Sequence, residues 1–146
     1  MPTVLIVEDN QSVAKFYALA LERGGQMSCL RGHSAEEVLA QARAGKVDLV
    51  LLDVSLASFT YRGRAIDGLA LSRLLKDDPG TRHIPILLAT AHAMEGDRER
   101  FLDASGADDY LQKPIYEPQV LVDKVKSLLA PPGAGASGVK GPALRR

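Results

Sequence analysis

The chain alternates between short apolar runs and longer stretches in which apolar residues recur three or four positions apart. Residues 4–7, 49–52 and 84–89 are nearly continuous apolar runs, which are typical of strands buried on both faces of a parallel sheet. The runs at residues 27–30 and 109–111 are shorter or more mixed, and they predict two further strands. The stretch after each run predicts a helix, and the five helices end near Gly24, Gly45, Asp78, Gly106 and Pro131.

Signals for the start of a helix support this interpretation at two places. Asn10 precedes the first helix and can cap it, and residues 34–37 have the form of a capping box that opens the second helix. The fourth helix is expected over residues 95–105. Because strand and helix alternate five times, we predict an α/β fold with a parallel sheet covered by helices on both faces. Residues 55–66 show no convincing period, and we expect a long loop there.

The length of 146 residues leaves room for one domain and a tail. We assign residues 1–130 to the domain and expect residues 131–146, which are rich in Pro, Gly and Ala, to be flexible. The net charge is zero, but the charges of the tail are all basic, so residues 1–130 carry 15 basic and 18 acidic side chains. This balance argues against binding of nucleic acid.

The sequence also indicates where the protein works. No apolar stretch approaches the roughly 20 residues of a membrane span, and the N-terminus lacks the basic start of a signal peptide. The single cysteine, Cys29, excludes an internal disulfide and fits a reducing compartment. We therefore expect a cytoplasmic protein with no membrane partner.

Charged and hydroxyl side chains collect at the predicted carboxyl ends of the strands. Glu8 and Asp9 follow the first strand, Asp53 ends the third, Thr90 ends the fourth and Lys113 follows the fifth. In a doubly wound sheet these ends meet at one edge, where ligands bind. Two carboxylates about 4 Å apart repel each other by roughly 4 kcal/mol at an effective dielectric constant near 20. Three acids in one cleft therefore need a cation or raised pKa values, and with oxygen ligands alone Mg²⁺ is the natural choice.

A carboxylate, a divalent cation, a hydroxyl group and a lysine together suit the transfer of a phosphoryl group to Asp53. Mg²⁺ and Lys113 would neutralise the phosphoryl oxygens, and Thr90 would donate a hydrogen bond to one of them. The chain contains no P-loop and no glycine-rich loop of the kinase type, so it has no visible means of binding ATP itself.

These segments in their order resemble the receiver domain of response regulators in two-component signalling, over essentially residues 2–130. Each segment alone is weakly diagnostic, whereas the ordered set at strand-end positions is strongly specific. Residues 90–97 are also similar to stand-alone cell-cycle receivers of the DivK type. The resemblance implies a flavodoxin-like sheet of five parallel strands in the order 2-1-3-4-5 with five helices. The segments that carry it are Val7-Glu8-Asp9-Asn10, Leu52-Asp53, Thr90-Ala91 and Gly106-Ala107-Asp108-Asp109-Tyr110-Leu111-Gln112-Lys113-Pro114.

The resemblance implies roles for the acidic residues. Asp53 is then the phosphoacceptor, although an Asp at a strand end is also typical of a simple turn. Glu8, Asp9, Asp53 and the backbone carbonyl of Ser55 would hold Mg²⁺. Ser55 is in addition a candidate modulator of the site.

The resemblance also implies a switch. Thr90 would move toward the phosphoryl group, and this movement would let the Tyr110 side chain turn inward. The alternative is that Tyr110 is only a half-buried strand residue with no switching role. Lys113 would pair with the phosphate, and the bond between Lys113 and Pro114 would be cis. His92 is a candidate modulator of the access of water to the site.

The chain departs from the family in the segment that follows Asp53. Family members usually have Pro soon after the phosphoacceptor and Gly eight residues after it. Here Ala57 stands in place of the Pro, and Gly68 follows Asp53 by fifteen residues, so the loop is seven residues longer. Our hypothesis is that this loop contacts a partner or shields the acyl phosphate.

We thus expect a single-domain bacterial response regulator that accepts a phosphoryl group from a histidine kinase or histidine phosphotransfer protein. It would not be an enzyme, apart from this transfer to itself and slow autodephosphorylation. A downstream protein would bind the face formed by the fourth helix, the fifth strand and the fifth helix. One alternative is a receiver-fold binding module that works without phosphorylation. A phosphatase-like enzyme would need a second acid two residues after Asp53, where this chain has Ser55, and a nucleic-acid-binding regulator is disfavoured by the acidic domain.

Overall fold

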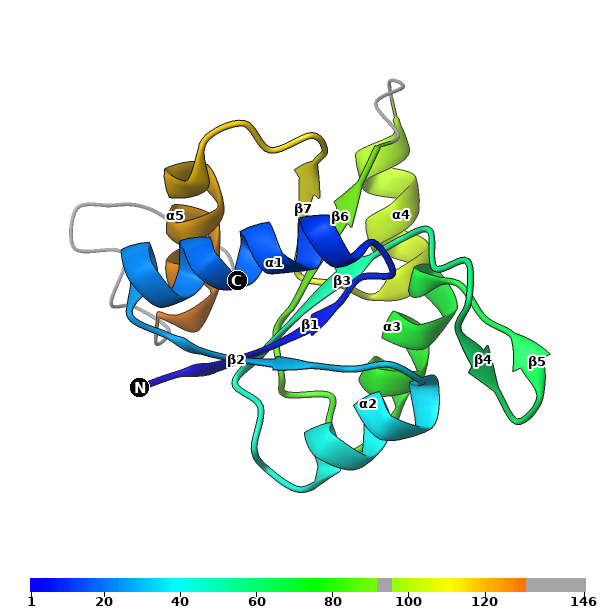
Figure 1. Cartoon of the computed structure of the whole chain (residues 1–146). Coiled ribbons are helices and arrows are strands. Elements are labelled where there is room, and N and C mark those ends of the chain that lie inside the picture. Colours follow the sequence, from blue (N-terminus) through cyan, green and yellow to red (C-terminus); the bar gives the residue numbers. More distant parts are fainter. Residues whose placement is uncertain (92–95, 131–146) are drawn as a thin grey trace.

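A single parallel sheet forms the centre of the fold (Figure 1). The structure is a computed structural model that describes residues 1–91 and 96–130, so His92 and the tail 131–146 lie outside the described residues. The sheet has five strands in the spatial order β2-β1-β3-β6-β7, and neighbouring strands pair in parallel. This order is the predicted flavodoxin-like one. The strands are β1 (Thr3–Val7), β2 (Ser28–Arg31), β3 (Leu49–Asp53), β6 (Ile86–Thr90) and β7 (Asp109–Gln112).

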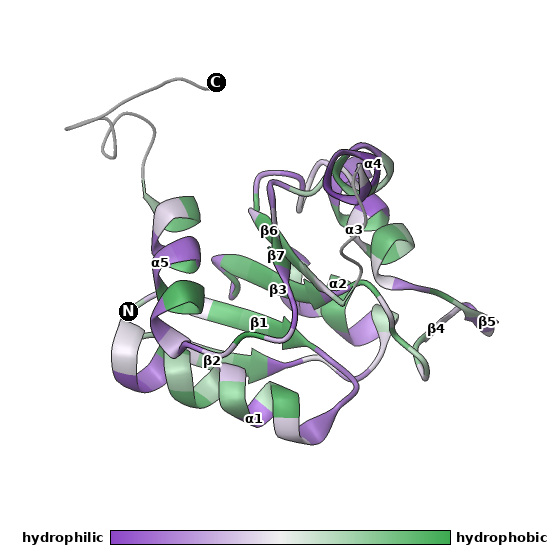
Figure 2. Ribbon diagram, turned by 90° about the horizontal axis from the view of Figure 1, so that it is seen from above, coloured by the Kyte–Doolittle hydropathy of each residue, from purple (hydrophilic) through white to green (hydrophobic). Residues whose placement is uncertain are grey.

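Helices cover both faces of this sheet (Figures 1 and 2). One face carries α1 and α5, and the other carries α2, α3 and α4. None of the helices within residues 1–91 and 96–130 is long and apolar enough to cross a membrane. Helix α1 continues directly into a short π-helical segment, η1 (Ala20–Gly24). The α-helices are α1 (Gln11–Leu19), α2 (Ala35–Arg43), α3 (Gly68–Asp77), α4 (Asp97–Ser105) and α5 (Pro118–Leu129).

Side-chain caps define where α1 and α2 begin. The Asn10 carboxamide accepts a hydrogen bond from the backbone of Val13 at 3.1 Å, and Ser34 accepts one from Glu37 at 3.1 Å. Both caps were predicted from the sequence, and a cap of this kind satisfies a backbone donor that has no partner within the helix. Because Asn10 directly follows Asp9, its cap also fixes the start of α1 beside the acidic end of β1.

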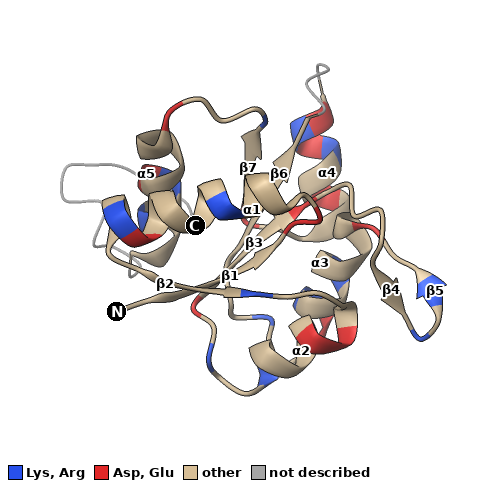
Figure 3. Cartoon of the chain, in the orientation of Figure 1, with Lys and Arg blue, Asp and Glu red and all other residues tan. Residues whose placement is uncertain are grey.

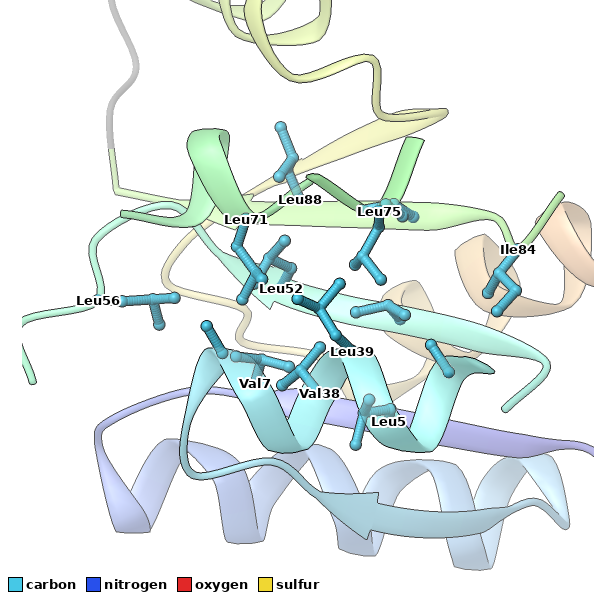
Figure 4. Packing of buried hydrophobic residues seen from close by; sticks show 14 of the residues in the cluster. Leu5, Val7, Val38, Leu39, Leu52, Leu56, Leu71, Leu75, Ile84 and Leu88 are labelled. Atoms are coloured by element: carbon cyan, nitrogen blue, oxygen red, sulfur yellow. The ribbon is translucent and has the colours of Figure 1, made fainter. Parts of the chain in front are cut away.

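The central strands contribute to the core on both of their faces, because successive side chains point in opposite directions. In β1, Leu5 and Val7 join the cluster beneath α2 and α3, whereas Val4 and Ile6 join the cluster beneath α1 and α5. Figure 4 shows the first of these clusters. Every residue of β3 is buried, including Asp53 at its end. Strands of this kind can be polar only at their tips, which places the chemistry at the edge of the sheet.

The segment 55–66, which we expected to be a long loop, contains two short strands. Strand β4 (Thr60–Tyr61) pairs with β5 (Arg64–Ala65) in an antiparallel hairpin that projects beyond α2 and α3 (Figure 1). Arg62 and Gly63 form the two-residue turn with φ of 52° and 81°, the left-handed conformation that such tight turns require. Phe59, which is 3% exposed, anchors the hairpin in the core. The expectation was wrong because strands of two residues are too short to show a period.

The inserted residues leave β3 and return to it at nearly the same point. The backbone N–H of Val54 donates to the Ala89 carbonyl at 3.0 Å, and that of Gly68 donates to the Val54 carbonyl at 2.8 Å. A Cβ atom on Gly68 would lie only 2.0 Å from the Asp53 carbonyl oxygen, so this close approach requires glycine. The hairpin is therefore looped out between two fixed points, and Asp53 keeps its place at the end of β3.

Candidate functional site

The carboxyl ends of the parallel strands bring the predicted residues to one edge of the sheet. Asp53 is the last residue of β3 and Thr90 the last of β6, while Glu8 directly follows β1 and Lys113 directly follows β7. The backbone N–H of Lys113 donates to the Thr90 carbonyl at 2.7 Å, which ties two of these ends together. Acidic residues lie at the ends of β1 and β3 (Figure 3).

Lys113 joins the two most buried acids of this edge. Its Nζ lies 3.0 Å from Glu8 Oε1 and 3.5 Å from Asp53 Oδ2. Glu8 is 4% exposed and Asp53 is 6% exposed, so both carboxylates are largely withdrawn from water. The backbone N–H groups of Asn10 and Ser55 donate to Glu8 at 3.0 Å and to Asp53 at 3.4 Å, respectively. The Lys113 ammonium group thus pairs with two buried carboxylates and lies closer to that of Glu8.

The pKa values of Asp53 and Lys113 are both raised, because two buried carboxylates share one lysine. Burial, reinforced by the charge of Glu8, raises the pKa of Asp53 to about 6, although Lys113 opposes the shift. For Lys113, burial disfavours the ammonium form, but the hydrogen bond to Glu8 and the charges of Asp53 and Glu8 outweigh burial and raise its pKa. Lys113 therefore stays charged at neutral pH, whereas Asp53 ionises at a cost. A second cation at this edge would be favourable.

Tyr17 on α1 is influenced electrostatically by the acids of this site, and it was not identified from the sequence. The side chain is 2% exposed on α1, and its hydroxyl has no hydrogen-bond partner among residues 1–91 and 96–130. Burial raises the pKa of Tyr17, and the charges of Glu8 and Asp53 raise it further. In the sequence, Tyr17 is one more residue on the apolar stripe of a helix, so nothing signals that its hydroxyl is buried and influenced by the charges of Glu8 and Asp53.

Asp9 does not join the cluster formed by Glu8, Asp53 and Lys113. Its Oδ2 accepts a hydrogen bond from the backbone N–H of Ser58, and its Oδ1 accepts one from the Ser58 hydroxyl, both at 3.1 Å. Ser58 lies in the inserted segment and was not identified from the sequence. Within residues 1–91 and 96–130, no three or more His, Cys, Asp or Glu side chains are placed to share one metal ion. The acids have the oxygen donors and uncompensated charge that suit Mg²⁺, but Asp9 is turned toward Ser58.

The remaining predicted residues surround this edge. Thr90 is 1% exposed at the end of β6, and Ser55 is exposed just after β3. Tyr110 is half-buried on β7, with its ring centroid 6.4 Å from that of Phe101 on α4. The peptide bond between Lys113 and Pro114 is cis, as the resemblance implied.

The sheet order and the strand-end acids with their lysine define a receiver domain. The chain belongs to the response regulator receiver domain family, whose model matches residues 4–126. It is similar to the polar-differentiation response regulator DivK of Brucella ovis, with 37% identity over 127 residues that cover 87% of this chain and 95% of that protein. The DivK of Brucella anthropi is 36% identical over the same share of each chain.

Solved structures agree with this assignment. A putative response regulator from Chloroflexus aurantiacus matches with a TM-score of 0.74 and 38% identity, covering 88% of this chain and 98% of that one. The chemotaxis response regulator CheY4 of Vibrio cholerae has a TM-score of 0.73 and covers 88% and 99% of the two chains, but at 22% identity it supports the fold alone. Receiver domains are signalling proteins of two-component systems and are generally not enzymes. They generally bind Mg²⁺ at their acidic site and interact with histidine kinases and downstream targets.

Proposed function

We propose that this DivK-like receiver accepts a phosphoryl group on Asp53 from a histidine kinase or a histidine phosphotransfer protein in the cytoplasm. The observation that carries the proposal is the contact of Lys113 with both Glu8 and Asp53, at 3.0 and 3.5 Å. It puts a buried carboxylate nucleophile, a second acid and a fixed cation at the end of one parallel sheet. A receiver needs this combination to take up a phosphoryl group and hold it.

In the proposed transfer, an Asp53 oxygen forms a bond to phosphorus as the bond from phosphorus to the donor histidine nitrogen breaks. The charge of the side chain changes from −1 to about −2 at neutral pH. Lys113 would then move its interaction from the carboxylate to the phosphoryl oxygens, and Thr90 would donate a hydrogen bond to one of them. Mg²⁺, when bound, supplies further positive charge to these oxygens.

The residues that would hold Mg²⁺ are Glu8, Asp9, Asp53 and the backbone carbonyl of Ser55. Support comes from their donor chemistry, since hard oxygen ligands suit Mg²⁺, and from the excess of acids over Lys113 at this edge. Slow loss of the phosphoryl group to water completes the proposed cycle, with Ser55 beside Asp53 as a candidate modulator of its rate.

The proposed output is a shift between two populated states that changes the affinity for a downstream protein. We assign the partner to the face formed by α4, β7 and α5. Tyr110 and Phe101 lie together on this side and connect β7 to α4. Tyr116, which precedes α5, is 86% exposed, and Val120 near the start of α5 is 47% exposed, so apolar surface is available there for a partner.

Incubation with acetyl phosphate and Mg²⁺, followed at once by intact-mass measurement, tests the proposal. We expect an adduct of about 80 Da, the mass of one phosphoryl group, which the Asp53→Ala variant loses and the exposed-site control Asp103→Ala keeps. Absence of the adduct from the wild-type protein contradicts the proposal and favours a module that binds without phosphorylation. Rapid repeated turnover of the donor favours an enzyme instead.

A further inference from the structure

The inserted segment holds Asp9 by both of its carboxylate oxygens. Ser58 donates its backbone N–H to Oδ2 and its hydroxyl to Oδ1, each at 3.1 Å. Asp9 and Ser58 are 49 residues apart in the sequence, so only the fold brings them together. A two-point contact of this kind fixes the orientation of a carboxylate, because rotation of the side chain breaks both hydrogen bonds at once.

Ser58 is held firmly, although its own side chain is exposed. The next residue, Phe59, is buried in the core, and its carbonyl accepts a hydrogen bond from the Ile66 N–H at 3.1 Å. Farther along the hairpin, the backbone N–H of Arg62 donates to Glu36 on α2 at 2.9 Å. The position of Ser58 is therefore set by the core and by α2, and Asp9 is the partner that must adapt.

Asp9 in this orientation is not assembled with the other acids. Glu8 and Asp53 both contact Lys113, but Asp9 does not complete a group of three carboxylates with them. No three carboxylates among the described residues are placed to share one metal ion. Mg²⁺ requires oxygen ligands in near-octahedral geometry at roughly 2.0–2.1 Å, so a carboxylate that points away from this geometry binds the ion weakly. To serve as a ligand together with Asp53, Asp9 has to turn away from the inserted segment.

We propose that Ser58 is a latch that holds Asp9 in a non-ligating orientation and is released when Asp9 binds Mg²⁺. The inference rests on the proposed function, because it takes Asp9 as a ligand of the metal. Ser58 is a positioning residue that acts through Asp9. Since Mg²⁺ and Ser58 compete for one carboxylate, binding of the metal leaves the backbone N–H and the hydroxyl of Ser58 without Asp9 as their acceptor. A partner that holds the hairpin in its present position would weaken the binding of Mg²⁺. By linkage, Mg²⁺ would weaken the binding of that partner by the same factor.

Titration with MgCl₂, followed by calorimetry on the whole unphosphorylated chain, measures the strength of the latch. The Ser58→Ala variant loses the hydroxyl donor and keeps the backbone donor, so one hydrogen bond is removed. We expect its Kd for Mg²⁺ to fall by about 3- to 10-fold, the net worth of such a bond, and Ser58→Gly to change it in the same direction. The control Thr60→Ala, on an exposed residue of the same hairpin, should leave the Kd within about 2-fold of the wild type.

A second measurement reads the latch directly. In the wild-type protein, hydrogen exchange of the Ser58 amide, observed by NMR, should accelerate when Mg²⁺ is added, because that amide loses its acceptor. A Kd in Ser58→Ala that is equal to or higher than that of the wild type overturns the latch, as does an amide that exchanges no faster with Mg²⁺. If the wild type binds no Mg²⁺, or if Asp9→Asn binds it as tightly as the wild type, the metal assignment in the proposed function fails and the latch fails with it. The phosphoryl adduct on Asp53 tests the acceptor separately.

Discussion

The buried carboxylate of Asp53 destabilises the fold at neutral pH, and Asp53→Asn should relieve this. The pKa of Asp53 is raised from the ordinary 3.8 to about 6, first by burial and then by the charge of Glu8. The folded protein therefore binds more protons than the unfolded chain between these two values, and its free energy of unfolding falls as the pH rises through that window. Above about pH 6 the full penalty applies.

The size of the effect follows from the shift. About two pKa units at 1.36 kcal/mol each give roughly 3 kcal/mol as an upper limit. Asparagine recovers less than this, because Lys113 then keeps only Glu8 as a charged partner. We expect Asp53→Asn to raise the free energy of unfolding by about 1–2 kcal/mol at pH 7.5, and the gain to vanish below about pH 4.

Urea denaturation in EDTA, followed by far-UV circular dichroism, measures this difference at several pH values. Circular dichroism is used because the chain has no tryptophan whose fluorescence could report unfolding. Subtracting the wild-type curve removes the titration of groups that both proteins share. Asp103→Asn, on an exposed carboxylate, is the matched control and should show no gain at any pH. A gain for Asp53→Asn that is absent at pH 7.5, or that persists unchanged to pH 4, refutes the assignment of a raised pKa to Asp53.

Two other substitutions test the surroundings of the site by the same denaturation assay. Tyr17→Phe removes a buried hydroxyl that has no hydrogen-bond partner in the described part of the chain, and it should stabilise the fold by about 1 kcal/mol. The exposed control Tyr116→Phe should change nothing, and a loss of stability in Tyr17→Phe would mean that the hydroxyl is hydrogen-bonded. Gly68→Ala places a Cβ atom 2.0 Å from the Asp53 carbonyl oxygen and should lower the free energy of unfolding by at least about 3 kcal/mol. The control Gly80→Ala, whose nearest contact would be 3.4 Å away, should lower it by less than about 1 kcal/mol. Similar losses for the two variants would show that the backbone around Gly68 shifts easily.

The architecture and the identity of the acidic edge were predictable from the sequence, and both predictions depend on local patterns. Continuous apolar runs such as residues 49–52 can be satisfied only by strands that are covered on both faces. Caps such as Asn10 and Ser34 are formed with residues three positions away, so they are visible in the sequence. Once the sheet is parallel, residues at strand ends must meet at one edge, and this places Glu8 and Asp53 together without any structure.

Tertiary structure alone decided how these side chains are paired. The contact of Lys113 with Glu8 spans 105 residues, and the grip of Ser58 on Asp9 spans 49. The burial of the Tyr17 hydroxyl likewise depends on the side chains that pack around it. Such pairings depend on differences of a few tenths of an ångström that are set when the helices pack on the sheet, and no local period encodes them. The sequence by itself determined which groups reach the edge; the packed fold determined that Lys113 lies closer to Glu8 than to Asp53, and that Asp9 faces the hairpin.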